Sequence, residues 1–182
     1  MSAMDTIRLA TEALIRLFQA EIDPHTLLVA ADDVFEATDV PALLLQGPTP
    51  VEDTRRRTLA QWTERDQTAM TCRRGRYPRL YHLEFELVAS AGDERSLLTL
   101  VGNVAALYQR LPLLMVPDLG DLPLTEVTPL GGWRRVNLSN LRQASGRLRL
   151  EDCPVGDADA LQTETGHLIM TPIIAVEVGG RT

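Results

Sequence analysis

The chain contains no lysine, so all 18 of its basic residues are arginine. The planar guanidinium group of arginine forms bidentate pairs with carboxylates and tolerates burial at interfaces better than an ammonium group does. The 25 acidic residues outnumber the basic ones and give a formal net charge of −7. General affinity for nucleic acid needs a cationic surface that displaces counterions. The charge therefore argues against a nucleic-acid-binding function.

Long hydrophobic runs are also missing. No window approaches the roughly eighteen consecutive apolar residues of a membrane-spanning helix. The first residues, Met1–Asp5, are not basic and no apolar run follows them, so the sequence predicts no signal peptide. We therefore expect a soluble intracellular protein.

Cysteine is scarce and catalytic signatures are absent. Cys72 and Cys153 lie far apart and fit no metal or redox spacing, so we expect two free, buried thiols. The chain has no glycine-rich phosphate loop, no G-x-S-x-G or H-E-x-x-H motif and no paired C-x-x-C. The sequence thus predicts no enzyme activity, no metal and no cofactor.

The clearest structural signal lies between Arg76 and Pro112. Its first half alternates apolar and polar residues, which predicts a strand with one buried face; the apolar positions are Tyr81, Leu83, Phe85, Leu87 and Ala89. Its second half predicts a helix, because apolar residues recur three or four apart, at Leu97, Val101, Val104, Tyr108 and Leu111. Ser90 and Asp93 resemble a loose capping box ahead of it. Further apolar residues on this helix predict burial on more than one side, by the sheet and by another subunit.

The remaining segments predict a single α+β domain over residues 1–182, with a mostly antiparallel, mixed sheet and two main helices on one face. Asp5 is expected to cap a first helix ending near Glu21. Short strands are expected at Thr26–Ala31, Pro41–Gln46, Leu113–Val116 and Leu122–Val127, and extra C-terminal strands at about 133–178. Gly47–Pro50 and Gln143–Gly146 are expected to be breaks or links rather than strand.

A long excursion is predicted at about residues 51–76, as an arm or a long hairpin. It holds many charges and few large apolar residues, so we expect it to become ordered on a neighbour or partner. Arginine and tryptophan are enriched at protein interfaces. The candidate subunit or tube interface therefore comprises Arg55, Arg56, Arg57, Trp62, Arg73, Arg74, Arg76, Arg134 and Arg135. These arginines are expected to pair with acids of the next subunit, such as Asp32, Asp33, Glu84 or Glu86.

One cluster has the residue types of a metal site. His82, Glu84 and Glu86 share one face of the predicted central strand and could converge on a metal. Alternation alone already requires polar residues on that face, so a solvated surface is the favoured interpretation. A small metal-dependent enzyme stays open as an alternative function.

The order of these elements resembles that of the tail terminator, or cap, proteins of bacteriophages and of phage-like contractile injection systems. An N-terminal helix (Asp5–Glu21) leads to an apolar strand (Pro41–Gln46) and then to a charged, arginine-bearing stretch (Glu52–Arg57). A strand preceded by proline follows at Tyr77–Tyr81 and opens into a helix that contains Leu97-Leu98 and ends near Pro112. The likeness covers about the first two thirds of the chain.

The resemblance implies a non-enzymatic, hexameric ring that closes the tail tube at the end away from the baseplate and halts its polymerisation. The implied partners are further copies of the chain and the tail tube protein, with a sheath protein as a further candidate, and the implied place of assembly is the bacterial cytoplasm. A monomeric head–tail or tail adaptor is the second alternative. Measuring the mass in solution separates these classes.

Overall fold

The computed structural model describes residues 3–22, 26–29, 40–57, 61–66, 71–135, 141–156 and 162–164. The chain divides into two compact units. Unit 1 comprises Met1–Thr58 and Pro78–Ala158, and unit 2 comprises Leu59–Tyr77 and Asp159–Thr182. Neither described helix combines the length and hydrophobicity that crossing a membrane requires.

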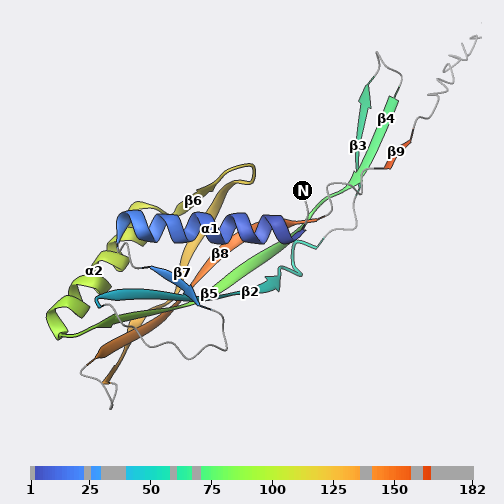
Figure 1. Ribbon diagram of the computed structural model, residues 1–182. Helices are drawn as coiled ribbons and strands as arrows, with labels where there is room; N and C mark the ends of the chain where they lie inside the picture. Colours follow the sequence, from blue (N-terminus) through green and yellow to red (C-terminus); the bar gives the residue numbers. More distant parts are fainter. Residues whose placement is uncertain are drawn as a thin grey trace, which may run out of the picture. The chain divides into compact units, whose positions relative to one another are not determined.

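Unit 1 holds both helices and a six-stranded sheet (Figure 1). The helices are α1 (Ala3–Glu21) and α2 (Glu94–Arg110). The strands, in their order across the sheet, are β1 (Leu27–Val29), β2 (Ala42–Glu52), β5 (Arg79–Ala91), β8 (Arg142–Val155), β7 (Gly120–Arg135) and β6 (Leu113–Val116). β1 runs parallel to β2, and all other pairs are antiparallel. The predicted α+β class with a mixed, mostly antiparallel sheet is confirmed.

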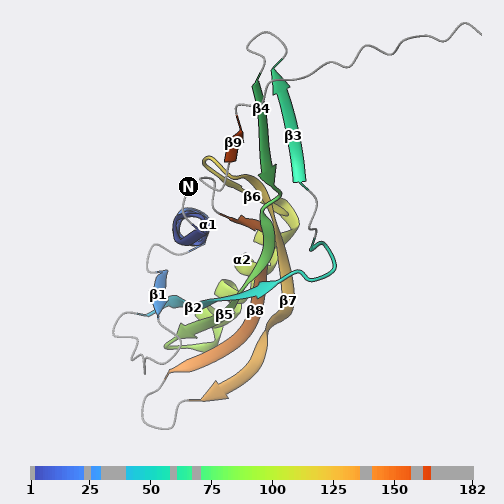
Figure 2. The same ribbon diagram turned by 90° about the vertical axis from the view of Figure 1, so that its right-hand side faces the viewer.

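The core lies between one face of this sheet and the two helices. β5 supplies alternate residues to it, including Leu83, Phe85 and Leu87, each at most 2% exposed. α1 adds Ala10, Leu14 and Phe18, and α2 adds Leu97, Leu100, Val104 and Leu107. Figure 2 views α1 along its axis, to one side of the strands. The side chains that alternate along β5 and those that recur about every 3.6 residues along the helices therefore pack together in one apolar layer.

The helix starts differ from the sequence prediction. α1 begins at Ala3, so Asp5 lies in its first turn rather than at its cap. Asp93 is the cap of α2, and its side chain accepts a 2.9 Å hydrogen bond from the Ser96 backbone N–H. Ser90 belongs instead to β5, where it is buried and accepts a hydrogen bond from Gln143. The predicted Ser90–Asp93 box is wrong because β5 extends past Ser90 to Ala91.

Two predicted breaks are continuous strand. β2 passes through Gly47 and Pro48 with a register shift, and Gly47 takes a φ of +128° beside the β5 backbone. β8 includes residues 143–146, which pair with β5 and β7. β7 likewise continues through Pro123 and Pro129, with register shifts after Glu126. Irregular pairing lets glycine and proline remain inside long strands.

In unit 2 the described residues form a three-stranded sheet. β3 (Gln61–Asp66) and β4 (Thr71–Arg76) make an antiparallel hairpin, and β9 (Gln162–Glu164) pairs with β4. The predicted excursion at 51–76 thus contains a hairpin, as the sequence indicated. Of the extra C-terminal strands predicted at about 133–178, residues 165–178 lie outside the described part of the chain.

Candidate interaction site

Seven ionisable side chains gather at the end of unit 1 where β2 finishes and β5 begins. The set holds three carboxylates, three guanidinium groups and one imidazole, and we call it the root cluster: Glu52, Asp53, Arg56, Arg57, Arg79, His82 and Asp152. Charges of both signs alternate in it. Such a cluster can hold several chain segments together without exposing a field of one sign.

Asp53 organises the turn that follows β2. Its backbone N–H donates to the carbonyl of Leu80 at 2.9 Å, and its Oδ1 atom accepts from the backbone N–H of Arg55 at 3.0 Å. The Oδ2 atom lies 3.6 Å from Nε of Arg56 and 3.8 Å from Nε2 of His82. A single aspartate thus fixes the turn locally, as aspartate does in many turns, and also ties it to β5.

Asp152 brings β8 into the same cluster. Leu150 pairs with Leu83 and Cys153 with Tyr81, so β8 has one more residue than β5 over this interval. Asp152 occupies this bulge with a φ of +59°, a conformation that aspartate adopts more readily than most residues. Its Oδ2 atom accepts a 2.6 Å bond from Nη1 of Arg56.

The inner part of the cluster is incompletely hydrogen-bonded. Glu52 Oε1 lies 3.5 Å from Nε of Arg57 and 3.9 Å from Nη1 of Arg79, and it makes no hydrogen bond. Nδ1 of His82 and Oδ1 of Asp152 are also buried without a partner among the described residues. Buried polar atoms of this kind cost free energy unless water or another chain reaches them.

The position of the root cluster in the chain explains what it does. The chain passes between the two units after Thr58, before Pro78 and after Ala158. Turn 53–57, the start of β5 and the bulge of β8 each adjoin one of these passages, and the root cluster joins all three. It therefore fixes, within unit 1, the points from which the chain leaves for unit 2.

The predicted metal-like trio does not converge. His82 faces Asp53, whereas Glu84 accepts from Arg149 at 2.6 and 3.1 Å across the sheet. Glu86 is exposed opposite Arg147. In the described part of the chain, no group of three His, Cys, Asp or Glu side chains is placed to hold a metal ion. Within its own chain Glu84 is thus already paired, and its predicted contact with a neighbouring subunit stays a prediction.

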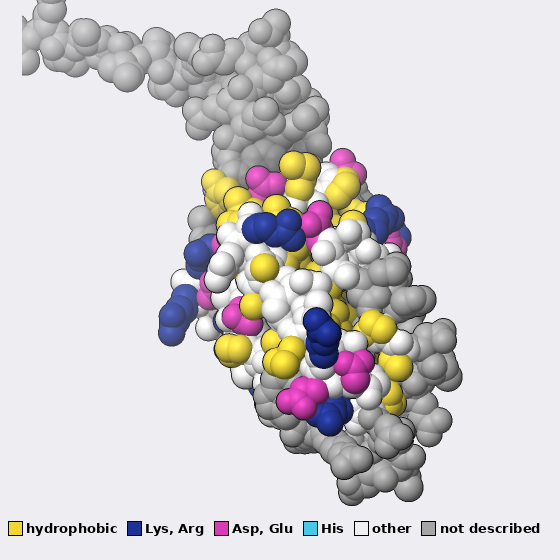
Figure 3. All heavy atoms as spheres, turned by 90° about the vertical axis from the view of Figure 1, so that its left-hand side faces the viewer, with side chains coloured by type: hydrophobic (Ala, Val, Ile, Leu, Met, Phe, Trp, Pro, Cys, Tyr) yellow, Lys and Arg dark blue, Asp and Glu magenta, His cyan; other side chains and the backbone are white. Residues whose placement is uncertain are grey.

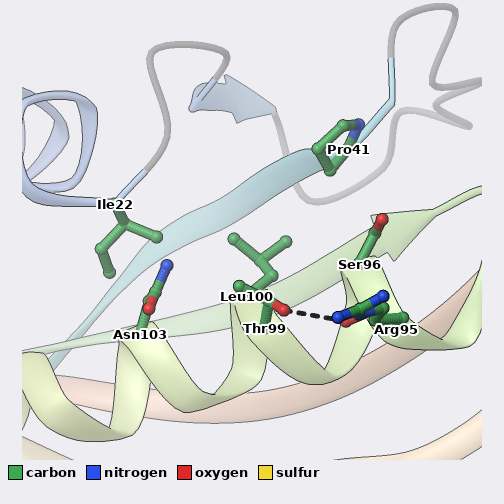
Figure 4. Close-up of a pocket in the computed structure, with 7 residues that line it drawn as sticks. All are labelled: Ile22, Pro41, Arg95, Ser96, Thr99, Leu100 and Asn103. Carbon is green, nitrogen blue, oxygen red and sulfur yellow. Dashed lines mark hydrogen bonds between the residues drawn. The ribbon is translucent and has the colours of Figure 1, made fainter.

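A shallow depression of about 370 Å³ lies between the two helices and the start of β2 (Figure 4). Ile22, Pro41 and Leu100 supply its apolar lining, and α2 contributes polar side chains from three successive turns. These are Arg95, Ser96, Thr99 and Asn103. The Thr99 hydroxyl donates back to the backbone carbonyl of Arg95 at 2.9 Å. The Arg95 guanidinium itself has no ion-pair partner among the described residues.

Several large apolar side chains are exposed. Met115 is 77% exposed, Leu98 52% and Leu113 50%. On the face that carries α2, hydrophobic side chains lie in small groups among charged and polar ones (Figure 3). In the described part of the chain, α2 is buried on one side, and Leu98, Ala105 and Ala106 on its other side are exposed. The second burial predicted for this helix requires another molecule.

The predicted interface arginines fall into three groups. Arg56 and Arg57 belong to the root cluster, where intrachain acids pair with them, and Arg55 beside them is exposed. The backbone places Trp62, Arg73, Arg74 and Arg76 in the β3–β4 hairpin of unit 2. It places Arg134 and Arg135 at the end of β7, opposite Gln143 and Arg142. The set is therefore not one continuous surface within either unit.

Sequence reasoning missed Asp152 as a partner of Arg56 and missed Arg95 as the cation at the depression. Asp152 is 96 residues from Arg56, so no local pattern connects them. Arg95 carried one usable signal, because it lies one turn ahead of Thr99 and two ahead of Asn103 on a single helix side.

Comparison with known proteins adds no relative: a scan against protein-family models and a search of curated proteins both find no match.

Proposed function

We propose that this protein is a tail terminator, which forms a ring on the end of a phage or phage-like contractile tail tube and stops its polymerisation. The observation that carries the proposal is the order of elements. α1 and β2 come first, the arginine-bearing stretch Glu52–Arg57 follows, and β5 then leads into α2. This is the order on which the resemblance to tail terminators rests. The protein would act in the bacterial cytoplasm during assembly and then remain in the particle.

The surface of unit 1 is consistent with a structural role. Its exposed apolar side chains lie on separate elements, with Leu98 on α2 and Met115 on β6. Two different surfaces on one subunit suit head-to-tail contacts, which close into a ring when the rotation between subunits permits. A sixfold ring would match a sixfold tube, and the number six rests on the resemblance alone.

Imaging assembled tails with and without the protein tests this function. Tubes that overgrow or vary in length without the protein, and that regain a uniform length when it is added back, are the expected result. Tubes of normal length in its absence would overturn the proposal. A mass measurement on the purified protein, alone and with tubes, distinguishes a ring from a monomeric adaptor.

A further inference from the structure

The depression on α2 is lined by apolar side chains and one arginine, and the β6–β7 hairpin carries an exposed apolar side chain beside carboxylates. The hairpin carries Asp118 in its turn and Asp121 in β7, both exposed and both without a partner among the described residues. Met115 stands directly opposite Asp121 in the hairpin and is the most exposed large apolar side chain in the described part of the chain. The hairpin therefore carries an exposed apolar side chain, Met115, close to two carboxylates, those of Asp118 and Asp121.

The depression offers the matching features. Ile22, Pro41 and Leu100 provide an apolar lining, and Leu98 is exposed on α2. The acids near the first turn of α2 already have partners, since Glu94 pairs with Arg142 and Asp93 accepts from Ser96. Among the described residues that line the depression, Arg95 is therefore the charged side chain without a partner, and its charge is positive.

The two surfaces do not overlap. α2 begins where β5 ends and runs toward β6, and the hairpin turn then projects beyond the far end of α2 (Figures 1 and 2). One subunit can therefore use both surfaces at once, each with a different neighbour. A contact of this kind is heterologous, which is the requirement for a ring of identical copies.

We infer that the β6–β7 hairpin of one copy docks into the α2 depression of the next copy, with Met115 against the apolar lining and Asp121 facing Arg95. This inference rests on the proposed ring and names its contact surfaces. A flexible thioether fits an irregular apolar site well. Charge pairing across the contact sets which partner and which orientation is accepted.

Charge exchange tests the contact in the full-length protein. Arg95→Glu and Asp121→Arg should each weaken association by about tenfold or more, and the two substitutions together should restore it. Arg16→Glu, an equally large charge change on the exposed side of α1, serves as the control and should leave association unchanged. Circular dichroism of each variant separates loss of contact from loss of fold.

Cross-linking gives an independent readout. In a Cys72→Ser background, Met115→Cys protein mixed with Thr99→Cys protein should form a disulfide dimer, while either protein alone should not. A chain carrying both substitutions should form a ladder that ends at the ring. Met115→Cys with Arg16→Cys should not cross-link.

The outcomes separate this contact from the function on which it rests. Rings that tolerate both single charge changes and show no 115–99 cross-link overturn the docking and leave the terminator proposal standing. A protein that never self-associates, either free or on tube ends, overturns both. A monomer that retains a small molecule in the depression would assign the depression to a ligand and also overturn the docking.

Discussion

Nη1 of Arg56 lies 2.6 Å from Oδ2 of Asp152, although the two residues are 96 positions apart in the sequence. The contact joins the turn after β2 to the bulge of β8. Both segments lead out of unit 1 toward unit 2. The root cluster therefore connects the segments that leave unit 1. Removing one of its side chains should increase the local motion of these segments more than it lowers the free energy of unfolding.

We expect Asp152→Asn to increase amide hydrogen exchange at residues 53–57 several-fold. Asparagine tolerates the positive φ of this position but cannot form the ion pair. The unfolding free energy should fall by less than about 1 kcal/mol, because the Arg56 side chain is 58% exposed. Arg8→Gln, which breaks the exposed Arg8–Glu12 pair of α1, is the matched control and should not change exchange at 53–57. Unchanged hydrogen exchange at residues 53–57 in Asp152→Asn would show that the Arg56–Asp152 ion pair does not hold this turn in place.

Limited proteolysis tests whether the excursion is ordered by assembly. Trypsin should cut isolated subunits near Arg55–Arg57 or Arg73–Arg76, since these segments are rich in arginine and poor in large apolar residues. The same sites should be spared in assembled particles. Equal resistance in both states would show that assembly does not protect this stretch.

Much of unit 1 was predictable because its signals are local. The alternation in β5 and the helical period in α2 each reflect a single buried face, which one segment of sequence records by itself. The irregular strands were not predictable in this way. Gly47 and Gly146 look like breaks, but the β5 and β7 backbones lie against them, and only the assembled sheet supplies that constraint.

The candidate sites were less predictable than the fold. The sequence marked Arg55–Arg57 as interface residues, yet two of the three pair with acids of their own chain. An arginine run shows that cations are present and does not show which carboxylates reach them. The depression on α2 depends on Ile22 and Pro41, which come from elements that sequence proximity does not connect to that helix.

Substituting alanine for three glycines should give opposite effects. A Cβ at Gly146 would lie 2.7 Å from the carbonyl oxygen of Thr128, and one at Gly47 would lie 2.9 Å from that of Glu84. Each change should cost about 1–3 kcal/mol of unfolding free energy. Gly102 in α2 has no neighbour within 4 Å, so Gly102→Ala should instead stabilise by about 1 kcal/mol. Urea unfolding measures all three, and a Gly146→Ala protein as stable as wild type would contradict the close approach.

The cap of α2 should make stability depend on acid pH. Hydrogen bonds from the backbone and side chain of Ser96 lower the pKa of Asp93. The ionised carboxylate therefore stabilises the folded state above the unfolded pKa of about 3.9, and this stabilisation is lost as the pH falls through the lowered folded value. Wild type should be more stable than Asp93→Ala at pH 7, and the difference should shrink below about pH 4. A difference that stays constant from pH 7 to pH 2.5 would mean that the charge of Asp93 does not contribute.

Cys153 should behave as a protected thiol. It is fully buried, and burial raises its pKa to about 11. Iodoacetamide at pH 8 should therefore label Cys153 only after unfolding, as measured on its peptide by mass spectrometry.

The raised pKa of Cys153 also determines how stability changes at alkaline pH. The unfolded thiol ionises near its ordinary pKa, so stability should fall as the pH rises from about 9 toward 11. Cys153→Ala should be less stable at neutral pH, because it leaves a cavity, but should lack this part of the alkaline loss. Rapid labelling of Cys153 in the native protein, or equal alkaline slopes for the two proteins, would contradict a buried, protonated thiol.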